Sequence, residues 1–298
     1  MPGNRPTIRP TILVTGAAGQ LGSELAAALA AHGAVVACDR ATLDLANASR
    51  IVEVVREVSP QLIVNAGAYT AVDRAEAERE LAFAVNARAP GILAEEARRS
   101  GAVLIHYSTD YVFDGTARQP YDEAAAAGPQ NVYGESKLEG ERAVAASAAQ
   151  ALTFRTSWVY SLHGKNFLTT IRRLAAERDE LRIVADQVGV PNWSRGLAAA
   201  TATLVGRGLA YLAGRAGLYH LSAQGAATWF EFAQAIVGDT GHPRVTPITT
   251  AEYPTPARRP AYGVLDTRRF AAAFGFSLPH WREQLDACLH APPEPPRH

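Results

Sequence analysis

The sequence has no net charge and no long apolar run. It contains 29 lysines and arginines and 29 aspartates and glutamates, so its overall charge does not favour nucleic acid or an anionic membrane. No stretch reaches the ~18 apolar residues of a membrane-spanning helix, and residues 1–10 contain no apolar core of a signal peptide. We therefore expect a cytoplasmic protein that works with neither nucleic acid nor a membrane.

Cysteine is scarce, and the histidines show no metal-binding spacing. Cys38 and Cys288 are the two cysteines, and their wide separation fits a reducing compartment better than a disulfide scaffold. The eight histidines include no pattern such as His-Glu-x-x-His. No metal ligand is therefore predicted from these residues, and His106 is expected to pack or pair inside a strand.

From Thr11 onwards, short apolar runs alternate with helical stretches, which is typical of βαβ units and a parallel sheet buried on both faces. The predicted strands are residues 11–15, 34–38, 61–65, 102–107 and 152–156. A prior of ~150 residues per domain suggests two domains for 298 residues. The predicted fold is α/β, with a Rossmann-type doubly wound parallel sheet and a smaller C-terminal substrate-binding α/β domain.

The expected domain limits are 1–160 for the dinucleotide-binding domain and 161–290 for most of the substrate domain. Residues 291–298, rich in proline, are expected to form a flexible tail. Apolar runs at 181–185 and 217–221 are candidates to return to the first sheet. One long helical stretch is expected to run towards Ser100, and further helices are expected at 166–178 and 196–212.

A glycine-rich turn lies between the first strand and the first helix. Gly16, Gly19 and Gly22 permit a tight turn and the close approach of a pyrophosphate to the helix N-terminus. A tight turn without a ligand is the simpler alternative, but the strand and helix stand where dinucleotide binding requires them. We therefore predict a nicotinamide dinucleotide cofactor.

The end of the second strand leaves the type of cofactor open. Asp39 stands where an acidic residue binds the adenosine ribose hydroxyls, whereas the adjacent Arg40 suits a 2′-phosphate. A solvated loop arginine is an equally good interpretation of Arg40. The sequence therefore allows NADPH, NADH or both.

Tyr133 and Lys137 are the predicted acid and the group that adjusts its acidity. They are four residues apart and share one face of a helix for which Asn131 is the expected N-cap. A nearby ammonium stabilises a phenolate, so Lys137 is expected to lower the pKa of Tyr133 from its ordinary value of ~10. An isolated pair would more often be a surface tyrosine beside a solvated lysine, so the prediction depends on the other motifs of the chain.

The ends of two further strands support the prediction. Thr109 follows the fourth strand, so its hydroxyl is expected at the carboxyl edge of the sheet, where a substrate oxygen needs a donor. Residues 65–70 leave the third strand in the same way, and small residues such as Ala66 let a flat cofactor lie against the backbone. Taken alone, either segment is ordinary turn chemistry.

With these motifs in place, the sequence resembles the extended short-chain dehydrogenase/reductase family, and within it the reductases of nucleotide-linked 4-keto sugars. The resemblance covers nearly the whole chain. It includes Gly-Gln-Leu-Gly in the first turn, residues 71–76, 106–113, 131–137 and 155–160, Asp186-Gln187-x-Gly189-x-Pro191, and Arg258-Arg-Pro260. The extension before Thr11 and the proline-rich end depart from the family pattern.

The resemblance implies a role for each matching position. The implied catalytic residues are Thr109, Tyr133 and Lys137. The implied cofactor-binding residues are Gly16, Gly19, Gln20, Leu21, Gly22, Asp39, Arg40, Asp44, Leu45, Ala66, Ala68, Tyr69, Thr70, Tyr107, Tyr133 and Lys137. The implied substrate-binding residues are Thr109, Asp110, Tyr111, Trp158 and Arg259, the last to meet the diphosphate.

The implied reaction is reduction by NADPH or NADH of the C4 ketone of dTDP-6-deoxy-L-lyxo-4-hexulose, which forms dTDP-L-rhamnose. Dehydratases of the family follow the active-site threonine with Asp-Glu, whereas Tyr111 follows Thr109-Asp110 here, so reduction is favoured over loss of water. The alternatives are another nucleotide-linked 4-keto sugar and a non-catalytic NADP-binding regulatory subunit. Some relatives carry Mg²⁺ at a dimer contact. The resemblance therefore leaves open whether this chain forms a homodimer and whether it binds Mg²⁺.

Overall fold

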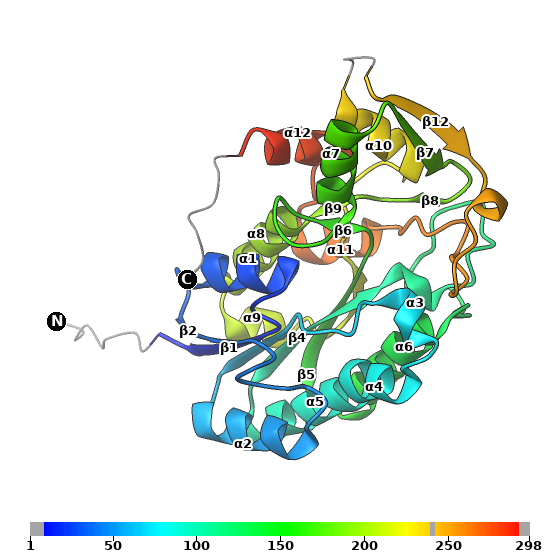
Figure 1. Ribbon diagram of the computed structural model, residues 1–298. Coiled ribbons are helices and arrows are strands. Elements are labelled where there is room, and N and C mark those ends of the chain that lie inside the picture. The colour runs from blue at the N-terminus through cyan, green and yellow to red at the C-terminus, as the bar shows by residue number, and fades with distance from the viewer. Residues whose placement is uncertain (1–8, 239–241, 292–298) are drawn as a thin grey trace.

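The computed structural model describes residues 9–238 and 242–291 (Figure 1). Its centre is a six-stranded sheet of order β10-β5-β4-β3-β1-β2, in which every neighbouring pair is parallel. The strands are β1 (Thr11–Thr15), β2 (Ala34–Cys38), β3 (Leu62–Asn65), β4 (Val103–Thr109), β5 (Gln150–Thr156) and β10 (Gly217–His220). The predicted parallel α/β fold is confirmed.

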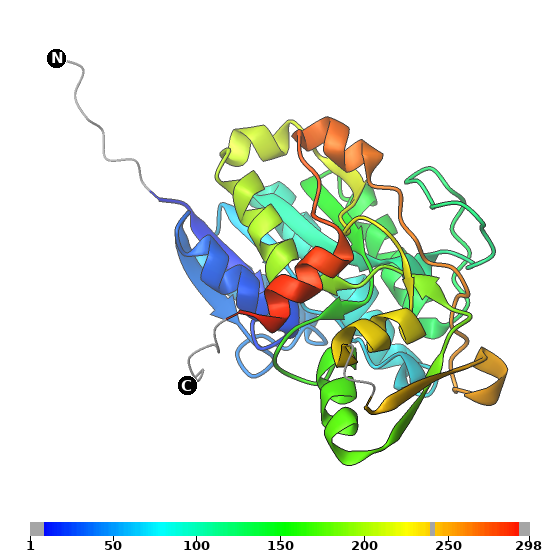
Figure 2. The same cartoon turned by 90° about the horizontal axis from the view of Figure 1, so that it is seen from above.

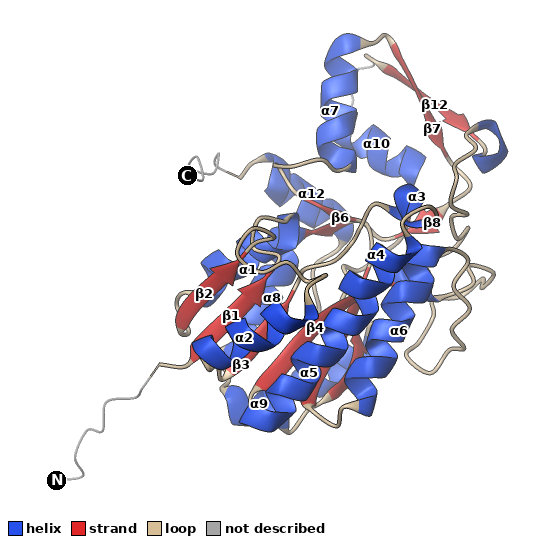
Figure 3. Cartoon of the chain, turned by 60° about the horizontal axis from the view of Figure 1, so that its bottom comes forward, coloured by secondary structure: helices blue, strands red, loops and turns tan. Residues whose placement is uncertain are grey.

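Helices cover both faces of this sheet, which explains why its strands read as continuous apolar runs. Every residue of β3 and β4 is buried. One face packs on α1 (Gln20–Leu29), α8 (Ser194–Val205), α9 (Leu209–Ala213) and α11 (Arg268–Phe274). The other packs on α2 (Ala48–Val58), α5 (Ala89–Ser100) and α6 (Val132–Ala146), with α2 and α5 in front of the strands in Figure 3.

The long helix expected before Ser100 is confirmed over residues 79–100, where α4 (Arg79–Phe83), a π-helical turn η1 (Ala84–Arg88) and α5 follow one another without a gap. The residues before it form only the short α3 (Val72–Ala75). Pro90 has no N–H to donate to the preceding turn. The buried Asn86 side chain accepts a bond from the Tyr69 N–H at 2.8 Å and donates to the Tyr69 carbonyl at 3.0 Å. The Asn86 side chain in the π-helical turn therefore fixes the backbone that follows β3.

A second unit lies beyond the carboxyl ends of the strands. It contains β6 (Val159–Tyr160) paired with β9 (Asn192–Trp193), β8 (Val188–Gly189) with β11 (Ala227–Thr228), and β7 (Glu180–Val184) with β12 (Arg244–Ile248). Its helices are α7 (Phe167–Glu177), α10 (Trp229–Val237) and α12 (Trp281–Leu289), and α7 lies beside α10 in Figure 2. The short helices η2 (Asp110–Val112) and η3 (Thr250–Glu252) complete the fold.

The two apolar runs that were candidates to return to the first sheet have different outcomes. The run at 217–221 forms β10 and pairs with β5. The helix α8, which precedes it in the chain, also returns to the first sheet and packs on α1. The run at 181–185 forms β7, which pairs with β12 outside the main sheet. The second unit has a core of its own, built around Tyr160, Phe232 and Trp281.

Within the described residues, no helix is long and apolar enough to cross a membrane. Cys38 and Cys288 are both buried. His106 is buried and its Nδ1 lies 3.1 Å from the Asn65 amide nitrogen, as expected for a histidine paired inside the sheet. The proline-rich end falls in 292–298, outside the described residues apart from Ala291.

Candidate active site

The glycine turn forms because two backbone segments approach each other too closely for side chains. Gly16 has φ +69°, and a Cβ there would lie 2.6 Å from the Gly67 backbone. A Cβ on Gly22 would lie 2.1 Å from the Gly16 carbonyl oxygen. Gly19 is the N-cap of α1 and provides no side chain to cap it. The turn therefore leaves backbone N–H groups at the helix start available to an anion.

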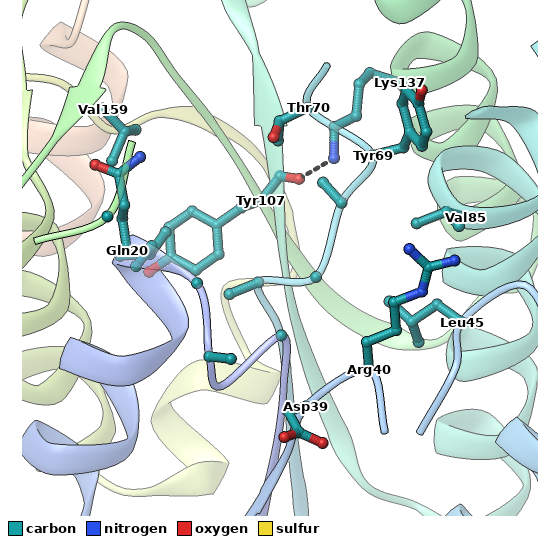
Figure 4. A pocket seen from close by; sticks show the side chains of 18 of the residues that line it. Gln20, Asp39, Arg40, Leu45, Tyr69, Thr70, Val85, Tyr107, Lys137 and Val159 are labelled. Atoms are coloured by element: carbon teal, nitrogen blue, oxygen red, sulfur yellow. Dashed lines mark hydrogen bonds between the residues drawn. The ribbon is translucent and has the colours of Figure 1, made fainter. Parts of the chain in front are cut away.

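This turn borders a cavity of about 500 Å³ at the carboxyl edge of the sheet (Figure 4). Its size falls in the range of small-molecule sites. The predicted cofactor residues that line it are Gly16, Gly19, Gln20, Leu21, Asp39, Arg40, Asp44, Leu45, Ala66, Ala68, Tyr69, Thr70, Tyr107, Tyr133 and Lys137. Gly22 does not line the cavity, because it lies behind the turn and allows α1 to pack against Gly16.

The helix that carries Tyr133 and Lys137 begins where the sequence predicts. The Asn131 side chain accepts a hydrogen bond from the Gly134 N–H at 2.8 Å and so caps α6. Lys137 is only 2% exposed, and its Nζ donates to the Tyr107 carbonyl at 2.6 Å (Figure 4). Burial lowers the pKa of Lys137 to about 8. The ammonium is thus anchored to β4 and faces the cavity.

The expected lowering of the Tyr133 pKa is wrong for the protein without cofactor. The ring borders the cavity and is only partly buried, yet enough protein surrounds it that desolvation raises the pKa of the phenol to about 12, against an opposing effect of the Thr109 hydroxyl. The Lys137 ammonium, which donates to the Tyr107 carbonyl, does not offset this rise. Tyr133 is therefore protonated at neutral pH, the form in which a phenol donates a proton.

Thr109, Asp110 and Tyr111 lie together where β4 ends. The Thr109 hydroxyl donates to Asp110 Oδ1 at 3.1 Å and accepts from the Tyr111 N–H at 3.2 Å. Asp110 Oδ2 is buried without a partner among the described residues, and burial raises the pKa of this carboxyl to about 7. The Tyr111 ring meets the Tyr133 ring edge to face, with 5.5 Å between centroids. The three residues thus adjoin Tyr133, although none lines the cavity itself.

Trp158 has an unusual backbone and a parallel aromatic partner. Its φ of +42° is rare for a bulky residue, and such strain is found most often at functional sites. The Trp158 ring stacks on Trp229 with 3.5 Å between centroids and 8° between planes. A Cβ on Gly189 would lie 2.4 Å from the Trp158 indole, so glycine is needed beside it.

Arg259, predicted to meet a diphosphate, already has a partner. Its guanidinium donates to Asp73 Oδ2 at 2.8 Å and to the Ala257 carbonyl at 3.1 Å. Asp73 Oδ1 also accepts from the Ala257 N–H at 3.1 Å. In this structure the arginine therefore ties its segment to α3.

Comparison with known proteins gives a consistent result. Residues 10–292 match a family model described as RmlD substrate binding domain. A dTDP-4-dehydrorhamnose reductase from Burkholderia thailandensis is 46% identical over 290 residues, covering 93% of this chain and 97% of that protein. The chain belongs to the dTDP-4-dehydrorhamnose reductase family. The enzyme of that name from Escherichia coli K12 is 43% identical over 290 residues and covers 94% of this chain and 97% of that protein.

Solved structures of the dTDP-4-dehydrorhamnose reductase family share the fold. The reductase from Bacillus anthracis strain Ames, crystallised in complex with NADP, has a TM-score of 0.88 and 36% identity. The match covers 94% of this chain and 99% of that one. The family resemblance predicted from the sequence is therefore confirmed.

Sequence reasoning missed part of the cavity that this member of the dTDP-4-dehydrorhamnose reductase family builds. The lining residues not predicted are Ala18, Leu43, Gly67, Leu81, Val85, Ser108, Thr156, Val159, His163, Gly164 and Lys165. The last three belong to a loop after β6 that returns to the glycine turn, where the Ser161 hydroxyl donates to Gln20 Oε1 at 3.1 Å. Asn166 is the residue from which this loop could have been predicted. Its side chain caps α7 and also donates to the Ser161 and His163 carbonyls.

No metal site accompanies the cavity within the described ranges. Among residues 9–238 and 242–291, no group of three or more His, Cys, Asp or Glu side chains is placed to hold a metal ion.

Proposed function

We propose that the protein reduces the C4 ketone of dTDP-6-deoxy-L-lyxo-4-hexulose to form dTDP-L-rhamnose, with NADPH or NADH as the reductant. The observation that carries this proposal is that Tyr133 and Lys137 line the same cavity as the glycine turn, with Thr109 beside Tyr133. The names of relatives that are 46% and 43% identical over almost the whole chain support the choice of substrate.

The cavity fits a nicotinamide dinucleotide. Gly16 and Gly19 let a pyrophosphate approach the uncapped start of α1. Beyond the turn, Ala66, Ala68 and Thr70 offer small side chains and backbone against which a flat ring can lie. The cofactor supplies the hydride when bound.

Tyr133 is proposed to protonate the substrate oxygen as negative charge develops on it. Its phenol has a pKa of about 12, so it is fully protonated at neutral pH and ready to donate. Thr109, which adjoins the phenol, is proposed to donate a hydrogen bond to the same oxygen and so stabilise the charge. For this the Thr109 hydroxyl must turn from Asp110 to the substrate.

Lys137 is proposed to hold the nicotinamide ribose. Its ammonium is fixed by the Tyr107 carbonyl at 2.6 Å and retains further N–H groups that can be donated to ribose hydroxyls. Its positive charge at the cavity wall also favours the anion that Tyr133 becomes after it gives up its proton.

The sugar is proposed to lie between Thr109 and Trp158, with Asp110 and Tyr111 beside it. Aromatic faces such as Trp158 pack well on the apolar face of a sugar ring. To bind the diphosphate, Arg259 must release Asp73, to which it donates a hydrogen bond in this structure. The dinucleotide-binding unit is proposed to contain residues 1–160 together with α8 and β10, which return to the main sheet. The substrate unit is proposed to contain most of the remaining residues of 161–290.

The test is to mix the purified protein with NADPH or NADH and dTDP-6-deoxy-L-lyxo-4-hexulose made in situ. Nicotinamide absorbance is followed while the sugar product is identified. Oxidation of the cofactor with formation of dTDP-L-rhamnose is expected. Cofactor binding without oxidation would contradict the proposal, and would favour another 4-keto sugar or a regulatory subunit.

A further inference from the structure

The helix α6 carries a buried carboxylate one turn beyond Lys137. Tyr133, Lys137 and Glu141 are spaced four residues apart, so they lie along one face of the helix, which packs against β4 and β5. Glu141 is 8% exposed and Lys137 is 2% exposed. The phenol, the ammonium and this carboxylate therefore form one row along α6, of which the proposed reaction uses only the first two.

Arg155 of β5 fixes the position of the Glu141 carboxylate. Its Nε donates to Glu141 Oε1 at 2.9 Å and its Nη2 donates to Oε2 at 2.6 Å. The guanidinium lies 4.9 Å from the centre of the Phe113 ring, and the Arg155 side chain is only 5% exposed. A pair of parallel bonds between charged groups holds the carboxylate in one orientation.

Stability alone does not explain this ion pair. A buried pair costs both partners their hydration, and apolar residues of similar volume often stabilise a fold as much or more. Arg155 Nη1 is, in addition, buried without a hydrogen-bond partner among the described residues, which costs further free energy. A role in the neighbouring site therefore explains the two charges better.

The ionisable groups around Lys137 belong to α6, β4 and η2. Tyr133 of α6 is protonated and uncharged at neutral pH. His106 of β4 is fully buried, and desolvation lowers its pKa well below the ordinary value, so it too is uncharged. The charge of Asp110, in η2, acts on Tyr133, whose pKa it raises. Glu141 is the charge that acts on the ammonium.

Glu141 opposes the cost of burying the Lys137 ammonium. The pKa of Lys137 is about 8, lowered by burial and raised by the negative charge of Glu141. Lys137 forms no ion pair with any residue in 9–238 or 242–291, and its Nζ donates to an uncharged group, the Tyr107 carbonyl (Figure 4). Without Glu141, the lysine would lose its proton closer to neutral pH.

We infer that Glu141, fixed by Arg155, is a positioning residue that keeps Lys137 charged and so supports the reaction without lining the cavity. The inference rests on the proposed function, in which the Lys137 ammonium holds the ribose and favours the anion that Tyr133 becomes. A neutral amine would lose one N–H donor and its attraction to that anion. Loss of the Glu141 charge should therefore slow the reaction most where Lys137 is about to lose its proton.

The sequence contains two lysines, Lys137 and Lys165, which makes the charge of Lys137 directly measurable. Protein labelled with ¹³C-lysine gives two sets of side-chain signals, and Lys165→Arg assigns them by removing one. The Lys137 Cε chemical shift is followed by NMR from about pH 5 to about pH 10 in the natural protein and in Glu141→Gln. The midpoint is expected at about 8 in the natural protein and about one unit lower in the variant.

Glu96→Gln is the matched control, because it also neutralises a buried carboxylate that an arginine bonds at two atoms. Arg56 of α2 donates to Glu96 of α5 at 2.9 Å and 3.0 Å. This variant should leave the Lys137 midpoint unchanged. Glu141→Asp keeps the charge and should retain a midpoint close to the natural one.

A double variant covers the case in which Glu141→Gln leaves a buried guanidinium that prevents folding. Glu141→Gln combined with Arg155→Met removes both charges, so neither is left unpaired. Because Lys137 still loses the nearby anion, its midpoint is expected to fall in this variant as well. Circular dichroism melting confirms that each protein is folded.

The same shift should appear in the reaction. Single-turnover rates of NADPH oxidation by dTDP-6-deoxy-L-lyxo-4-hexulose are measured at about pH 6 and about pH 8. A midpoint about one unit lower reduces the charged fraction of Lys137 about fivefold at pH 8 and by only about a tenth at pH 6. Glu141→Gln should therefore be about fivefold slower at the higher pH and nearly normal at the lower one.

Three results would overturn the inference: a Lys137 midpoint unchanged in Glu141→Gln, an equal displacement in Glu96→Gln, or a rate lowered by the same factor at both pH values. The last is what a purely structural role would give. Failure of the reductase proposal would look different, since the Lys137 midpoint would then shift without any formation of dTDP-L-rhamnose.

Discussion

Tyr133 and Lys137 have pKa values displaced in opposite directions by the same cause. Desolvation penalises whichever form carries charge, so it raises the pKa of the phenol to about 12 and lowers that of the ammonium to about 8. The phenol is consequently protonated, and the lysine remains largely charged at neutral pH. This combination suits proton donation to a developing alkoxide rather than proton removal from an alcohol.

Tyr133→Phe removes the proposed proton donor and keeps the ring. General acid catalysis contributes about 100- to 10,000-fold, so turnover is expected to fall on that scale, with the dissociation constant for NADPH nearly unchanged. Steady-state rates and calorimetry measure the two quantities. Turnover close to that of the natural protein would rule out Tyr133 as the acid.

Asp110 gives the stability of the protein a specific pH dependence. Its pKa is raised from 3.8 to about 7 on folding, so the folded state holds this proton more tightly than the unfolded chain. The stabilisation is complete below pH 3.8 and is lost as the pH rises to about 7. Asp110→Asn cannot ionise and does not suffer this loss.

The free energy of unfolding of Asp110→Asn, relative to the natural protein, is therefore expected to rise by roughly 2 kcal/mol between pH 5 and pH 8. Urea unfolding at the two pH values measures it. Asp179→Asn, which replaces an exposed carboxylate, is the control. A pH-independent difference between Asp110→Asn and the natural protein would show that Asp110 does not titrate between pH 5 and pH 8 in the folded state, which contradicts a pKa of about 7.

At the scale of elements, short strands of the second unit position side chains of the site. β8 ends at Gly189, against which the Trp158 indole packs, and the Gly263 N–H donates to the Val188 carbonyl at 2.8 Å. A Cβ on Gly263 would lie 2.4 Å from Asp110 Oδ2. One small strand thus links the surroundings of Trp158 and of Asp110.

Gly189→Ala is expected to displace the Trp158 ring from its stack on Trp229, because the added Cβ would lie 2.4 Å from the indole. If Trp158 supports the sugar, the KM for the dTDP-sugar should rise about tenfold, a loss of ~1.4 kcal/mol, with cofactor affinity retained. Steady-state kinetics and tryptophan fluorescence measure the change.

Gly214→Ala provides the matched comparison for this substitution. Gly214 has φ −70°, and the nearest atom to an added Cβ is 3.6 Å away, an ordinary contact. Its KM should be unchanged. A normal KM in Gly189→Ala, with altered fluorescence, would remove Trp158 from the substrate site.

At the scale of the whole molecule, the cavity lies where the two units meet. The loop of residues 161–166 follows β6 of the second unit and contacts Gln20 of the first, and Arg259 and Asp73 form another link between them. A bound dinucleotide would touch both units, so it is expected to stabilise the folded state.

NADPH at about 100 times its dissociation constant is expected to stabilise the folded state by about 2.7 kcal/mol. For a chain of this size that corresponds to a rise of several degrees in melting temperature. Differential scanning fluorimetry across a range of NADPH concentrations measures it. An unchanged melting temperature at saturating NADPH would contradict cofactor binding to the folded state.

The sequence by itself determined the elements whose signals are local. The inner strands of the main sheet, β1, β3, β4 and β5, are largely buried runs. The glycine turn needs a residue without Cβ, and Asn131 caps α6 through a bond within its own first turn. These features depend on neighbouring residues, so periodicity, glycine spacing and capping chemistry are enough to predict them. The placing of Tyr133 and Lys137 on the cavity wall follows from the same signals.

Only the tertiary structure decided what depends on residues far apart in the chain. The Asn86 side chain bonds the Tyr69 backbone from a π-helical turn, β7 pairs with β12, and the loop containing His163 and Lys165 completes the cavity. The Tyr133 pKa rises instead of falling because folding surrounds the phenol with protein. Burial and long-range hydrogen bonds set these outcomes, and neither is encoded in local spacing.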